Sequence, residues 1–152
     1  MSNEFILMMH PAFGVMAILA SVWVFAETIN AKDSNLSRIR YVSWAVAGLM
    51  WAAFLVGGYW YVLHYAPDKA LIKSGPWPFA HNFVMESKEH VFLSLLLLAS
   101  FLPIATSNNL VTNKGTRSVV LWSTALIVAM GLAMEGGGAL ISMAVKVALL
   151  AK

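Results

Sequence analysis

Positions 81–90, with the sequence HNFVMESKEH, concentrate the side chains of this chain that are most capable of chemistry. They contain two of the four histidines and two of the seven acidic residues, and they lead directly into an apolar run at 91–98. Imidazole groups can ligate haem iron or other metals, and carboxylates can accept protons. Ionised side chains at the start of a membrane-spanning helix are costly and tend to be functional. This segment is therefore the first candidate for a site.

The composition indicates whether this segment lies in water or in a membrane. The 152 residues are 60% hydrophobic and 11% charged, against about 25% charged residues in soluble domains. We therefore predict an integral membrane protein, and we interpret the net charge of +3 as a topology signal rather than as a nucleic-acid-binding surface. The lack of cysteine excludes disulfides, thiolate metal sites, iron–sulfur clusters and covalent c-type haem attachment. The non-basic N-terminus predicts no cleavable signal peptide.

The predicted fold is an all-α, four-transmembrane-helix bundle that forms one domain over residues 1–152. Apolar segments at about 5–29, 42–65, 82–104 and 118–140 each suffice for a hydrocarbon core that needs about 20 helical residues. The last apolar stretch continues to residue 150, and as one helix from 118 it would reach about 50 Å. We therefore expect a tilted or kinked fourth helix, or a break at Gly136-Gly137-Gly138 with 139–152 as an extension or interfacial helix.

Basic residues suggest an orientation for the bundle. The loops after the first and third spans carry five of the ten lysines and arginines, namely Lys32, Arg38, Arg40, Lys114 and Arg117. Because positive residues favour the cytoplasmic side, we expect these loops inside and both termini outside. The membrane expected is a bacterial inner (cytoplasmic) membrane.

When the four spans are placed in this way, the histidines and most of the acidic residues within the spans fall in one half of the bundle. His10 begins the first span, His64 ends the second, and Glu135 lies about 26 Å along the fourth. Glu27 lies at the opposite end, where we expect it to pair with Arg38 or Arg40.

Helical spacing ranks the candidates within the opening segment. His81 and His90 are nine residues apart and must therefore face opposite sides of a helix. We expect the deeper His90 to face the bundle interior, with Glu86 on the same face and Glu89 at its edge. His81 is expected at the interface, and Lys88 is expected to turn to the headgroups or to pair with an acid.

Two histidines facing each other across a bundle could hold a b-type haem. The best pairs are His64 with His90 and His10 with His90. Gly57 and Gly58, two turns from His64, suit either a flat macrocycle or close helix packing.

This arrangement of four spans with histidines near one face resembles small four-helix membrane cytochromes b. The resemblance implies an electron-transfer subunit of a larger respiratory-type complex, rather than a complete enzyme. Its redox partner would be a quinol or another subunit, and Glu86, Glu89 and Glu135 would transfer protons.

Two further hypotheses follow from the same residues. His10, His64, His90 and a carboxylate could bind copper, zinc or iron, for transport or for oxidase chemistry. Alternatively, the protein binds no cofactor and is an accessory or assembly subunit of a membrane complex. Its polar side chains would then form interhelical contacts, such as Lys88 with Glu135.

Overall fold

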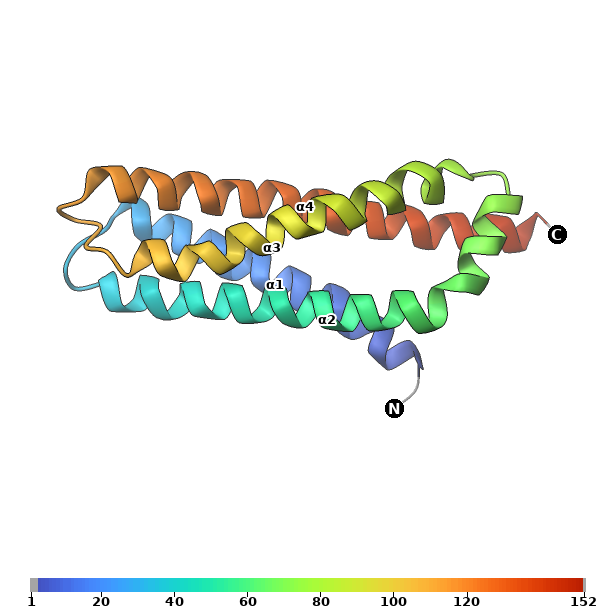
Figure 1. The fold of residues 1–152 in the computed structure, drawn as a ribbon, viewed down its shortest axis with the longest axis horizontal. Coiled ribbons are helices and arrows are strands. Elements are labelled where there is room, and N and C mark those ends of the chain that lie inside the picture. Colours follow the sequence, from blue (N-terminus) through green and yellow to red (C-terminus); the bar gives the residue numbers. More distant parts are fainter. Residues whose placement is uncertain (1–2, 152) are drawn as a thin grey trace.

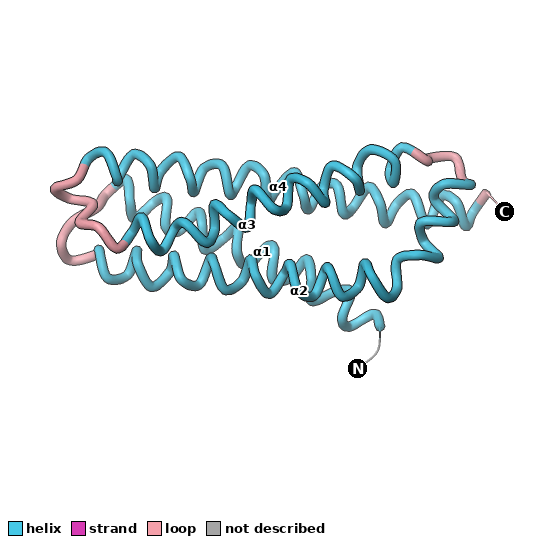
Figure 2. Tube along the Cα trace, in the orientation of Figure 1, coloured by secondary structure: helices cyan, strands magenta, loops and turns pink. Residues whose placement is uncertain are grey.

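The computed structural model describes residues 3–151, and these form a bundle of four long helices (Figure 1). The elements are α1 (Asn3–Ile29), α2 (Leu36–Ser74), the π-helix η1 (Ala80–Met85), α3 (Glu86–Thr106) and α4 (Lys114–Leu150). Within this part of the chain no strand occurs, as Figure 2 shows. The predicted all-α four-helix bundle is confirmed.

All four helical segments, taking η1 and α3 together, are long and apolar enough to cross a membrane. Large apolar side chains cover the outer surface, where lipid replaces water as the solvent. They include Leu19, Trp44, Leu55, Leu97, Trp122 and Leu132. One end of the bundle, which we call the loop end, carries the connections at 30–35 and 107–113. The chain termini and the connection at 75–78 lie at the other end (Figure 1).

The second helix is much longer than the predicted span at 42–65. It continues through Pro67 to Ser74, so the loop expected from Ala66 onward shrinks to 75–78. Beyond its middle, α2 turns out of line toward the far part of α4 (Figure 1). Pro67 accounts for a bend there, because proline removes a backbone donor and its ring displaces the preceding turn.

The fourth helix does not break at its three glycines. It is continuous for 37 residues, which corresponds to about 56 Å. Gly137 is buried, and a Cβ there would lie 3.2 Å from Val84 Cγ1 and 3.3 Å from Lys88 Cδ. The glycines therefore allow η1 and α3 to approach α4 closely, and this packing keeps a poor helix-forming stretch helical.

Several charged groups at the loop end are paired. Glu27 makes an ion pair of 2.9 Å with Arg38, as predicted, and its carboxylate also accepts a hydrogen bond from Asn35. Arg40 donates to the carbonyls of Thr106 and Ser107, and Arg117 donates to that of Ile29. Cationic side chains thus satisfy carbonyl groups at the ends of α1 and α3.

An apolar core fills the half of the bundle next to the loop end. Its buried members include Val24, Ile39, Val46, Leu102, Val120 and Ile127. The hydroxyl groups of Ser21, Ser43 and Thr124 in this region donate to carbonyls of their own helices. These hydroxyls therefore contribute no interhelical polar contact.

Candidate functional site

The polar residues gather in the other half of the bundle, as the sequence predicted. Glu135 lies about 21 residues beyond Lys114, which is about 32 Å along α4. A hydrocarbon core is about 30 Å thick. If the arginines of the loop end lie at one membrane boundary, Glu135 lies level with the other.

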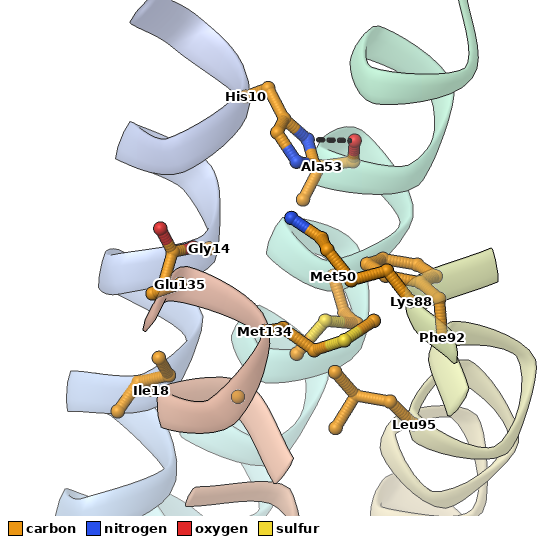
Figure 3. A pocket seen from close by; sticks show the side chains of 11 residues that line it. His10, Gly14, Ile18, Met50, Ala53, Lys88, Phe92, Leu95, Met134 and Glu135 are labelled. Carbon is orange, nitrogen blue, oxygen red and sulfur yellow. Dashed lines mark hydrogen bonds between the residues drawn. The ribbon is translucent and has the colours of Figure 1, made fainter. Parts of the chain in front are cut away.

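Three ionisable side chains from three helices line one small cavity at this level (Figure 3). They are His10 of α1, Lys88 of α3 and Glu135 of α4, and the cavity volume is about 20 Å³. All three side chains are partly buried. Apolar side chains complete the lining, among them Ile18, Met50, Phe92, Leu95 and Met134.

The His10 imidazole is held in one orientation by α2. Its Nδ1 donates a hydrogen bond of 2.8 Å to the carbonyl of Ala53 (Figure 3). Since a carbonyl only accepts, the proton of a neutral His10 must be on Nδ1, and Nε2 then carries the free lone pair. His10 can therefore act as a base or as a ligand through Nε2.

Each of the three side chains lies against a glycine of a neighbouring helix. The His10 ring occupies the space where Gly57 lacks a side chain, because a Cβ at Gly57 would lie 2.7 Å from Cε1. A Cβ at Gly14 would overlap Oε1 of Glu135, and a Cβ at Gly138 would lie 3.1 Å from Lys88 Nζ. Close approach of the helix backbones thus brings the three groups together.

Lys88 and Glu135 interact electrostatically without direct contact. Each charge acts on the other, yet no ion pair within 4.0 Å joins them in the described chain. The cavity beside them can hold one water molecule, which needs at least about 10–15 Å³ and two to four polar partners. The side chains of His10, Lys88 and Glu135 supply enough polar partners for a water molecule that would connect the three groups.

The prediction that His90 and Glu86 face the interior is wrong. His90 is exposed, and its Nδ1 donates to the carbonyl of Glu86, which is itself exposed. Both border a shallow hollow on the outer surface. Lys88 and His90 are two residues apart in α3 and so point to nearly opposite sides, and it is Lys88 that faces the interior.

The inward-facing histidine of the segment is His81. Its side chain is 2% exposed, its Nδ1 shares a hydrogen bond of 3.1 Å with the Tyr65 hydroxyl, and its Nε2 lies 3.7 Å from Glu86 Oε1. The nine-residue spacing correctly indicated that only one of the two histidines points inward. Depth along the sequence was the wrong criterion for choosing between them, and it also misplaced Lys88.

The structure does not bring the predicted metal ligands together. His64 lies against the Trp60 ring at 4.8 Å between centroids, His90 is on the outer surface, and His10 is bound to Ala53. No group of three His, Asp or Glu side chains in the described residues could hold a metal ion, so the predicted non-haem site is not formed. The His10 ring fills the space at Gly57, and Gly58 faces open space.

The fold and the site define a four-helix membrane bundle with a small polar cavity in one half. Comparison with known proteins finds no matching family model, no matching curated protein and no matching solved structure. Function must therefore be argued from the cavity itself.

Proposed function

We propose that this protein takes up and releases protons at one membrane face, as a subunit of a larger membrane complex. The observation that carries the proposal is the cavity into which three helices bring one imidazole, one ammonium and one carboxylate group. Charged groups in an apolar bundle are costly, and they usually mark proton or ion pathways when they occur.

The chemistry of the three groups suits proton exchange. Nε2 of His10 can accept a proton, the Glu135 carboxylate can accept another, and the ammonium of Lys88 can stabilise the charged carboxylate. One water in the cavity would connect them through short hydrogen bonds.

The distribution of polar groups favours exchange on one side over conduction across the membrane. The cavity adjoins the end that carries Tyr65, His81 and Glu86, whereas an apolar core separates it from the loop end. Short loops leave little room for a catalytic domain, so a partner would use the protons.

Infrared difference spectroscopy between acidic and alkaline pH tests this proposal on the full chain in nanodiscs. We expect a carboxyl C=O band that titrates and that Glu135→Gln removes. Glu89→Gln, a matched change at an exposed carboxylate, should leave that band in place. Identical spectra for the wild type and Glu135→Gln would refute the proposal.

Electron transfer through a b-type haem is a second candidate function. It is favoured by the presence of all four histidines in the half of the bundle that holds the cavity. Ligation by His10 with His90, or by His64 with His90, would require His90 to turn inward from the outer surface.

The haem proposal predicts an absorption band near the ultraviolet edge of the visible spectrum that shifts on reduction with dithionite. His90→Ala should abolish the band if His90 is a ligand, whereas Glu89→Gln should retain it. Full retention of haem in His90→Ala would refute that ligand choice. A colourless protein that keeps the Glu135 infrared band would refute the haem proposal and support proton exchange alone.

A further inference from the structure

We infer that Tyr65, His81 and Glu86, here called the relay cluster, carry protons between the membrane face and the cavity. The inference rests on the proposed function of the cavity and adds the route by which protons reach it. It assigns a role to the most deeply buried histidine of the protein, whose side chain is 2% exposed.

The contacts of His81 have the form of a relay. One ring nitrogen lies 3.7 Å from an oxygen of the Glu86 carboxylate, a side chain that is 49% exposed, and the other shares a hydrogen bond with the hydroxyl of the buried Tyr65. An imidazole can accept a proton on one nitrogen and release one from the other. His81 therefore connects a carboxylate that reaches the surroundings to a hydroxyl inside the bundle.

The relay cluster and the cavity lie along the same helix interface. Val84 and Lys88, which follow His81 by about one and two turns, both face Gly137 of α4. Glu135 lies two residues before that glycine. Tyr65 and Ala80 pack in one apolar cluster with Ile141 of α4, one turn beyond Gly137. The two sites thus occupy consecutive levels of one contact between α4 and the helical segment 80–106.

Charges of both signs surround His81. Lys69 and Lys73 from α2 act on it, as do Glu86 and Glu89 from α3. The π-helix that carries His81 is a backbone form often found at functional sites.

The transfer is a balanced proton exchange. Glu86 receives a proton from water and gives it to Nε2 of His81, and Nδ1 then releases a proton to the Tyr65 oxygen. Tyr65 passes its own hydroxyl proton to water on the cavity side. One proton enters and one leaves, no bond between heavier atoms changes, and water is the only co-reactant.

A pH jump followed by time-resolved infrared spectroscopy of the Glu135 band tests the relay in nanodiscs of phosphatidylcholine. We expect Glu86→Gln and His81→Gln to slow protonation of Glu135 by about tenfold or more, with the final amplitude unchanged. Asn82→Ala, at an exposed polar residue on the same segment, should leave the rate unchanged. Glu86 is exposed, so its variant keeps the test valid if His81→Gln fails to fold.

The outcomes separate the two proposals. An unchanged rate in Glu86→Gln, with the Glu135 band present, would overturn the relay and leave the cavity function intact. Absence of any titrating Glu135 band in the wild type would overturn both. Equal slowing in Glu86→Gln and Asn82→Ala would also overturn the relay, because it would indicate a general surface effect.

Discussion

At the scale of single residues, two adjacent glycines have opposite roles. Gly57 faces the His10 ring, whereas a Cβ at Gly58 would meet nothing within 4 Å. We predict that Gly57→Ala destabilises the protein by about 1–3 kcal/mol, because the added methyl overpacks the contact and displaces His10 from Ala53. Gly58→Ala should stabilise the helix by about 0.5–1 kcal/mol. Denaturant unfolding in detergent measures both, and equal effects would contradict the proposed packing of His10.

The sequence predicted which residues belong to the site more successfully than how these residues are oriented. His10 and Glu135 were predicted to lie in the same half of the bundle, and both line the cavity. Lys88 and His81 were misplaced, because depth along the sequence does not tell which of two opposite helix faces points inward.

At the scale of helices, the three consecutive glycines of α4 show whether this stretch is needed for close packing or for bending. A Cβ at Gly136 meets nothing within 4 Å, whereas one at Gly137 would press on Val84 and Lys88. We predict that Gly136→Ala raises stability by about 0.5–1 kcal/mol and that Gly137→Ala lowers it. Thermal unfolding in detergent measures the difference. A loss of stability in Gly136→Ala would contradict this account and indicate that α4 must bend there.

Hydropathy predicted that four helices exist but not where they end. A span that is apolar on every side carries little helical periodicity, so its buried face cannot be read from the sequence. The end of α2 was missed for a different reason. Pro67 is normally a helix breaker, yet α2 continues through it. At the glycines of α4, where the sequence left a break open, the packing of Val84 and Lys88 on Gly137 keeps the helix continuous.

At the scale of the whole molecule, the two ends of the bundle differ in chemistry. Arginines pair with carbonyls and with Glu27 at the loop end, and the cavity and relay cluster lie toward the other end. The positive-inside rule predicts that the loop end lies in the cytoplasm. If so, the relay cluster exchanges protons with the outer side of the membrane.

Single cysteines test this orientation directly, because the chain contains no cysteine of its own. Asn109→Cys places an exposed thiol at the loop end, and Pro78→Cys places one at the opposite end. We predict that a membrane-impermeant maleimide labels only Pro78→Cys in intact bacterial spheroplasts, and labels both after permeabilisation. The reverse pattern would place the relay cluster on the cytoplasmic side. Labelling of both variants without permeabilisation would contradict a bundle whose two ends are separated by a membrane. The segment between positions 78 and 109, which contains α3, would then not cross the membrane.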